Sequence, residues 1–193
     1  MDHTEKHLST FQREYLRELE IPRQQLLALA DAIPAEAYGW RPAADARSFS
    51  AVLVHIAAGN LMLLYRADVC LPEVMELAGS IEGDGPAQWL ELLHKMIAME
   101  KTVTAKPAVI DILCRSFDDV RTSFASVTEQ QLEETRSFFG EQTTQRRLYL
   151  RILAHSDEHM GQAIAYARAM GYAVPWPDPI KRMEELVAAA PGN

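Results

Sequence analysis

The sequence contains few of the residues that build disulfide-rich or β-rich proteins. Its 193 residues include two cysteines, nine glycines and ten prolines. Cys70 and Cys114 lie far apart and in no motif, so we expect reduced thiols packed in or near the core, without a disulfide framework. No stretch alternates polar and apolar residues for long enough to predict a convincing strand. These absences favour an all-α protein that forms one domain over residues 1–193.

Basic runs and long uninterrupted apolar segments are also missing. The formal net charge is -8, and without a run rich in Lys and Arg we expect no groove for nucleic acid. The N-terminus is polar and lacks the apolar region of a signal peptide. The most apolar stretch, residues 49–65, contains His55 and Asn60 and is short for a membrane span. We therefore expect a cytoplasmic protein that contacts no membrane.

Helical patterns fill most of the chain. Apolar residues recur at helical spacing in segments that glycine and proline separate. Ser48 is a good N-cap for the second long helix, Gly171 is a typical residue to end the fourth, and Pro22 should kink or break the first. Residues 70–86 are expected to be irregular, and 136–140 to form a loop or a short extended piece. The predicted long helices cover residues 4–31, 48–65, 106–127 and 143–170, and shorter ones cover 88–99 and 180–190.

Four long helices with connections of medium length predict a four-helix bundle with short additional helices. The second long helix is apolar nearly all round, so it should be buried on most sides. Bundles often build metal sites in the core from side chains on facing helices. Polar residues on the core faces are therefore the first candidates for a functional site.

Two histidines lie on the face of the fourth long helix that should point into the core. Residues four apart lie one above the other on a helix, so His155 and His159 take positions where Leu or Ile would normally lie. Burying two imidazoles costs free energy unless each finds a partner. A divalent metal would satisfy both, because neutral imidazole is a common ligand for zinc, nickel and iron. The stripe runs through Leu148, Ile152, His155, His159, Gln162 and Tyr166.

A third histidine, His55, lies inside the apolar second helix among Ala57, Ala58 and Gly59. These small residues leave room for a ligand cavity or for a close helix contact. Taken alone, His55 could be a core histidine bonded to a backbone carbonyl or a carboxylate. Three histidines on two helices that must both be buried favour a shared metal. Three protein ligands leave positions open for water or substrate, as in catalytic sites.

A different metal motif overlaps the same helix. His155, Glu158 and His159 match His-x-x-Glu-His, the inverted zinc-peptidase pattern in which Glu158 would be the general base. Such enzymes need a carboxylate ligand well downstream. Only Glu184 and Glu185 follow, in a segment predicted to be a surface helix. We therefore disfavour a peptidase.

The remaining histidines have simpler interpretations. His3 and His7 repeat the four-residue spacing, but they lie among charged residues at a terminus expected to fray, so we interpret them as a solvated pair. His94 has no partner at a useful spacing. No serine lies in a Gly-x-Ser-x-Gly setting and no phosphate-binding glycine loop is present. The sequence thus predicts three metal ligands and identifies no general base.

The chain resembles the DinB-like family of metal-dependent enzymes over about residues 8–176. The resemblance implies a bundle with up-down-down-up order and a long crossover, nickel or zinc held by His55, His155 and His159, and a homodimer. Residues 70–104 depart from the usual pattern as a longer insertion that could reshape the cleft. The matching motifs are Ile33-Pro34, Trp40-Arg41-Pro42, Arg47-Ser48-Phe49, His55-Ile56-Ala57, Phe117-Asp118-Asp119-Val120-Arg121, Leu153-Ala154-His155, His159-Met160-Gly161-Gln162 and Tyr166-Ala167-Arg168.

Members of this family with a known activity use low-molecular-weight thiols, as bacillithiol transferases and a mycothiol-dependent maleylpyruvate isomerase do. The resemblance therefore implies a thiol-dependent S-transferase, or a related transferase or hydrolase, that acts on a small molecule. The alternative is a stress-related module without turnover, in which the histidines hold a metal for stability or bind a ligand. Ligand chemistry alone does not choose between zinc, nickel and iron.

Overall fold

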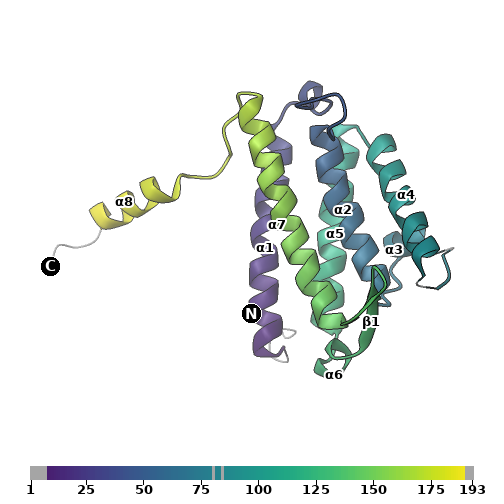
Figure 1. Cartoon of the computed structure of the whole chain (residues 1–193). Coiled ribbons are helices and arrows are strands. Elements are labelled where there is room, and N and C mark those ends of the chain that lie inside the picture. The colour runs from purple at the N-terminus through teal and green to yellow at the C-terminus, as the bar shows by residue number, and fades with distance from the viewer. Residues whose placement is uncertain (1–7, 80, 84, 190–193) are drawn as a thin grey trace.

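The computed structural model describes residues 8–79, 81–83 and 85–189. Long helices lying side by side form the body of the molecule (Figure 1), as the sequence predicts. Shorter elements occupy the connections, among them η2 (Ala35–Ala37) and α6 (Glu129–Leu132). The long helices are α1 (Thr10–Ala32), α2 (Phe49–Arg66), α5 (Lys106–Ser126) and α7 (Gln145–Ala169).

Hydrogen bonds between the helices establish an up-down-down-up order. At the start of α1, the Gln12 side-chain amide donates to the Phe124 carbonyl at the end of α5, over 3.0 Å. Nearby, the Tyr15 hydroxyl donates to the Tyr149 carbonyl at the start of α7, over 2.8 Å. At the other end of α1, the Ser50 N–H of α2 donates to the Tyr38 carbonyl over 2.9 Å. Thus α1 and α7 run one way while α2 and α5 run the other.

The crossover that makes α2 and α5 parallel contains two helices, α3 (Pro72–Ala78) and α4 (Pro86–Thr102). The prediction that residues 70–86 are irregular was wrong over Pro72–Ala78, because Pro72 begins a helix, the position where proline costs least. That helix buries Val74, Leu77 and Ala78. The same prediction is confirmed for residues 79, 81–83 and 85, which lie between α3 and α4. The predicted helix over 88–99 is confirmed and extends beyond both predicted ends.

A small hairpin precedes α7. The predicted loop or short extended piece over 136–140 is confirmed as the end of its first strand and its turn, whereas the sequence predicted no second strand to pair with it. Strands β1 (Thr135–Phe138) and β2 (Glu141–Thr144) pair antiparallel with Phe138 opposite Glu141. Phe139 and Gly140 form the two-residue turn, with φ of 50° and 83° as a type I′ turn requires. Four-residue strands are too short to show a period of two. The Phe139 ring stacks on Trp89 of α4, with centroids 4.2 Å apart.

The helices begin and end at residues with local capping signals, and these ends do not always match the predicted bounds. Ser48 caps α2 through its hydroxyl, as predicted, and Gly171 has φ of 87° just beyond α7. The predicted start of the first helix near residue 4 was wrong, because Ser9 caps α1 in a capping box with Gln12. Residues 4–7 of that prediction lie outside the described part of the chain. Pro22 does not interrupt α1 and is buried within it.

Cys70 and the last helix lie outside the core. Cys70 is exposed, so its predicted place in or near the core was wrong, whereas Cys114 is partly buried; both are free thiols. The predicted last helix is present as α8 (Pro179–Ala189), which projects away from the bundle (Figure 1). By length and composition α2 could cross a membrane, but 89% of it is buried, as in the central helix of a folded core.

Candidate metal centre

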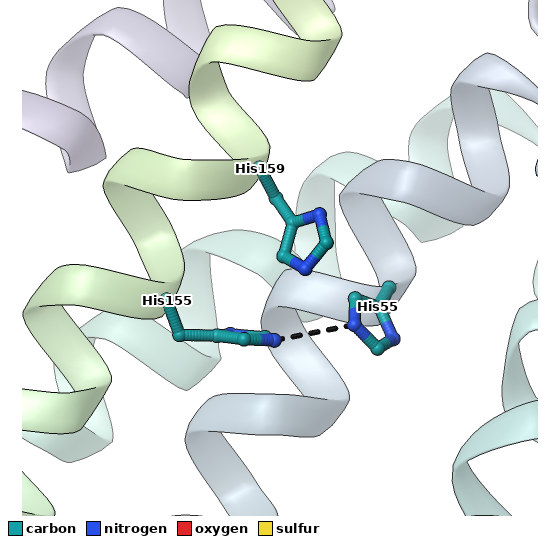
Figure 2. A group of neighbouring side chains, drawn as sticks. All are labelled: His55, His155 and His159. Carbon is teal, nitrogen blue, oxygen red and sulfur yellow. Dashed lines mark hydrogen bonds between the residues drawn. The ribbon is translucent and has the colours of Figure 1, made fainter.

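The three predicted histidines lie together in the structure. His55 of α2 meets His155 and His159 of α7, and one ring nitrogen of each lies within 4.8 Å of the others (Figure 2). The Nε2 atoms of His55 and His155 are 3.2 Å apart. This convergence arises because α2 and α7 pack antiparallel with their core faces in contact. Their function as metal ligands stays a prediction, but their geometry permits it.

His55 is oriented by a carboxylate that the sequence analysis missed. Its Nδ1 donates to Glu100 Oε1 of α4 over 2.7 Å, which leaves the Nε2 lone pair for another partner. Glu100 also accepts from Arg47 Nε over 2.8 Å. Burial would raise the pKa of Glu100, but the bonds from His55 and Arg47 outweigh it and lower that pKa. An ionised carboxylate beside a ligand histidine fixes its tautomer and raises its basicity.

His159 is held by its own helix. Its Nδ1 donates to Gln162 Oε1 over 2.9 Å, and the Gln162 amide donates to the Tyr166 hydroxyl over 3.0 Å. Trp40 packs edge-on against Tyr166, with ring centroids 5.4 Å apart. Gln162 and Tyr166 belong to the predicted stripe, so the same helical face provides both the histidine and the groups that orient it. The Nε2 lone pair of His159 is again left toward the centre of the cluster.

His155 fits into a space that Gly59 of α2 leaves free. A Cβ atom added at Gly59 would lie 2.8 Å from His155 Nδ1 and closer still to Cε1. The prediction that small residues around His55 allow a close helix contact is thus confirmed at Gly59. His155 Nδ1 is buried and has no hydrogen-bond partner. The ring is therefore held by packing, with only its Nε2 facing the other two histidines.

Burial favours the neutral form of two of these imidazoles, His155 and His159. Burial, followed by proximity to His55 and His159, lowers the pKa of His155 from 6.5 to about 3. Burial also lowers the pKa of His159, against the opposing effect of its bond to Gln162. A neutral imidazole has the lone pair that a metal needs, so the site is prepared for a cation before one arrives.

A divalent ion fits this donor set. Tetrahedral zinc with bonds of about 2.0–2.1 Å to nitrogen places its ligand atoms about 3.3 Å apart. The Nε2 atoms of His55 and His155 already have a separation of 3.2 Å. Without an ion, one of these two nitrogens donates a hydrogen bond to the other, and an ion would take the place of that bond. In the described part of the chain, no cysteine or carboxylate joins the cluster as a fourth donor.

A buried polar layer fixes the register of the helices beside the cluster. Asn60 of α2 donates to Ser116 of α5 over 3.2 Å and accepts from Ser156 of α7 over 3.5 Å. All three side chains are fully buried. Buried polar groups favour the one arrangement in which each is satisfied. Ser156 follows His155 directly, so this layer constrains where α7 places its histidines.

The other candidate residues lie elsewhere. Glu158 is exposed and pairs with Arg151 over 2.9 Å, so the cluster lacks the general base of the peptidase motif. His94 is exposed on α4. His3 and His7 lie outside the described residues. Glu100 could have been found from its sequence, because Trp89, Leu92, Met96 and Glu100 form a core stripe on α4 in which Glu replaces an apolar residue.

Comparisons with known proteins agree with the fold. A family model described as the DinB superfamily matches residues 18–163. A DinB-like protein from Bacillus cereus has a similar structure, with a TM-score of 0.59 and 16% identity over 85% of this chain and 95% of that one. A DinB-like protein from Bacillus subtilis gives a TM-score of 0.52 and 17% identity over 84% and 96% of the two chains. No curated protein matches this chain.

The family match covers most of the sequence, including the three histidines of α2 and α7. The solved structures share its helical arrangement at low identity, so they bear on the fold alone. The chain belongs to the DinB superfamily.

Proposed function

We propose that this protein is a metal-dependent S-transferase. It would join a low-molecular-weight thiol, through its sulfur atom, to a small electrophile. The observation that supports it is the convergence of three histidine rings without a fourth protein donor among the described residues. An open position beside three histidines is typical of catalytic metal sites, whereas structural sites are closed. Membership of the DinB superfamily supports the proposed reaction class, because members with a known activity use such thiols.

His55, His155 and His159 would hold the ion through their Nε2 atoms, and zinc or nickel fits this donor set. When bound, a divalent cation supplies a charge that lowers the pKa of a coordinated thiol and so favours the thiolate. Glu100 and Gln162 hold two of the rings by their Nδ1 atoms. Arg47 keeps Glu100 ionised. These groups position the ligands and exchange no proton with the substrate.

Metal analysis tests the first half of this proposal. Protein purified without a metal-affinity step is expected to contain close to one equivalent of zinc or nickel, or to take it up on titration. The triple variant His55→Ala, His155→Ala, His159→Ala is the matched control and should bind neither ion. If the wild-type chain takes up no ion, the metal site and the enzyme are both excluded.

Activity assays test the second half. The metal-loaded protein is incubated with glutathione, cysteine or bacillithiol and with electrophiles such as epoxides and aryl halides, and loss of free thiol is measured. Turnover that disappears in His155→Ala while helicity is retained supports the enzyme. A stoichiometric ion that raises the melting temperature, without turnover on the whole panel, would favour the alternative of a metal-holding module.

The assembly is a separate proposal. We propose a homodimer because of the family resemblance alone. Light scattering measures the mass directly: a value near twice 21.7 kDa supports the dimer, and a value near 21.7 kDa contradicts it.

A further inference from the structure

A cavity lies at the end of the bundle beside the hairpin, where α6 and β1 are seen in Figure 1. We name it the hairpin cavity. The end of α2, the end of α5, β1 and the start of α7 enclose it, and its volume is about 290 Å³. On α7 its wall residue Gln145 precedes His155 by ten positions, which is about 15 Å along the helix. The hairpin cavity is thus separate from the metal centre. The residues that line the hairpin cavity include Asp68, Ser123, Val127, Arg136, Gln145 and Tyr149.

Two buried donors of this cavity have no hydrogen-bond partner. They are the Nε of Arg136 and the hydroxyl of Ser123. Ser123 is 8% exposed, and the Arg136 side chain is 16% exposed. Buried polar groups in folded proteins are nearly always paired, and leaving one unpaired costs free energy. Two such donors on the wall of one cavity indicate a ligand that offers an acceptor.

The rest of the Arg136 guanidinium is held in a fixed orientation. One terminal nitrogen donates to the buried Gln145 Oε1 over 2.7 Å and to Glu134 over 2.8 Å. The same nitrogen pairs with Asp68 over 3.2 Å. The Nε–H is left without a partner and suits one oxygen of a carboxylate.

Asp68 is the weakest of these partners. Its side chain is 75% exposed, and such ion pairs contribute little to stability. Its backbone has φ of 59°, a conformation that aspartate tolerates at some cost and that often accompanies binding sites. An incoming carboxylate could therefore take the place of the Asp68 carboxylate on Arg136 while Gln145 keeps the guanidinium in place.

The remaining wall limits what the ligand can be. Val69, Leu71 and Val127 line the cavity together with Tyr149, so part of it is apolar. Asp68 and Glu134 beside Arg136 would repel a phosphate with two negative charges more strongly than a single carboxylate. We propose that the hairpin cavity binds a small monocarboxylate with a short apolar tail, its carboxylate on Arg136 and Ser123.

Isothermal titration with butyrate, on the full chain, tests this site. Acetate, hexanoate and benzoate extend the series, and butyramide and inorganic phosphate are the matched probes that lack the single carboxylate. Butyrate is expected to bind at least about tenfold more tightly than butyramide, because its charge strengthens each hydrogen bond. Absence of binding by every carboxylate, or equal binding of butyramide or phosphate, overturns the proposal.

Variants identify the residues. Arg136→Gln is expected to weaken butyrate binding by about 10- to 100-fold and Ser123→Ala by about 2- to 10-fold. Asp68→Asn removes the competing carboxylate and should tighten binding. The control Arg147→Gln, at an exposed residue that pairs with Glu141, should change nothing. If Arg136→Gln lowers the melting temperature, Ser123→Ala and Asp68→Asn still decide, and weaker binding in Asp68→Asn contradicts the proposal.

Discussion

The two halves of the stripe on α7 share one spacing and differ in what they do. Toward the hairpin, Leu148 and Ile152 are 1% and 0% exposed. There Tyr149 also packs against Phe124 and Tyr15. One and two turns further on, His155 and His159 are only partly buried. The apolar half stabilises the fold by burying apolar side chains. The histidine half instead places polar side chains in a partly buried cluster. The same helical face can therefore stabilise the fold at one end and form a candidate metal site at the other.

Replacing His155 should give the largest effect on the site and a small one on the fold. His155→Ala is expected to weaken zinc or nickel binding by more than about a hundredfold, because even residues that only orient ligands contribute about 10- to 100-fold. The metal-free protein should melt at a similar or higher temperature, since the variant removes a buried Nδ1 without a partner. Calorimetric titration and circular dichroism measure the two effects.

Replacing Ile152 should give the opposite result. Ile152→Ala leaves a cavity in the fully buried half and should lower the free energy of unfolding by about 2–5 kcal/mol. Metal affinity should stay near that of the wild type at temperatures where the variant is folded. Urea unfolding and metal titration are the measurements. If Ile152→Ala and His155→Ala destabilise the metal-free protein equally, the two halves of α7 do not differ as we infer.

Gly59→Ala tests whether the cluster depends on the close approach of α2 and α7. The added Cβ would collide with the His155 ring, and shifting that ring should weaken metal binding by about 10- to 100-fold, given that overpacking costs about 1–3 kcal/mol. Gly161→Ala on α7 is the matched control, since a Cβ there meets nothing within 4 Å. It should leave metal affinity unchanged and raise stability by about 0.5–1 kcal/mol. Equal metal affinity in both variants would contradict the packing inferred for His155.

Glu100→Gln probes how far the site depends on α4. The variant keeps the size of the side chain but removes the charge that pairs with His55 and Arg47. Metal affinity should fall by about tenfold, at the lower end of the range for groups that orient ligands. Glu158→Gln, at an exposed residue outside the cluster, is the control and should bind metal normally. A larger loss in Glu158→Gln would instead favour the peptidase-like arrangement.

The smallest expected effect is on pH dependence. Burial lowers the pKa of His155 from its ordinary value of 6.5 to about 3 in the folded protein. Between these values the unfolded chain binds more protons, so the contribution of this group to stability is complete above about pH 6.5 and is lost as the pH falls toward 3. The slope is at most about 1.4 kcal/mol per pH unit. Urea unfolding at pH 7, 6 and 5 with a chelator should show this fall in the free energy of unfolding, and His155→Ala should reduce the slope. A slope that His155→Ala leaves unchanged would show that other groups cause it.

Local signals in the sequence determined the helices and their buried faces. Ser48 marks a helix start through its side-chain hydroxyl, and Gly171 marks a helix end through its positive φ. The steps of three and four on α7 identify the core face without any knowledge of its neighbours. The pairing of the two strands escaped prediction, although the extended piece near 136–140 did not, because strands of four residues carry no measurable period. The helix α3 escaped it because proline and glycine nearby indicate a loop equally well.

The sequence by itself therefore determined the number of long helices and the inward direction of His55, His155 and His159. Only the tertiary structure decided that these rings meet, that Gly59 makes room for one of them, and that Glu100 orients another. The physical reason is how far apart in the sequence the interacting residues lie. Helical periodicity is set by residues three and four apart, whereas the contact between His55 and His155 joins residues 100 positions apart and depends on how whole helices pack.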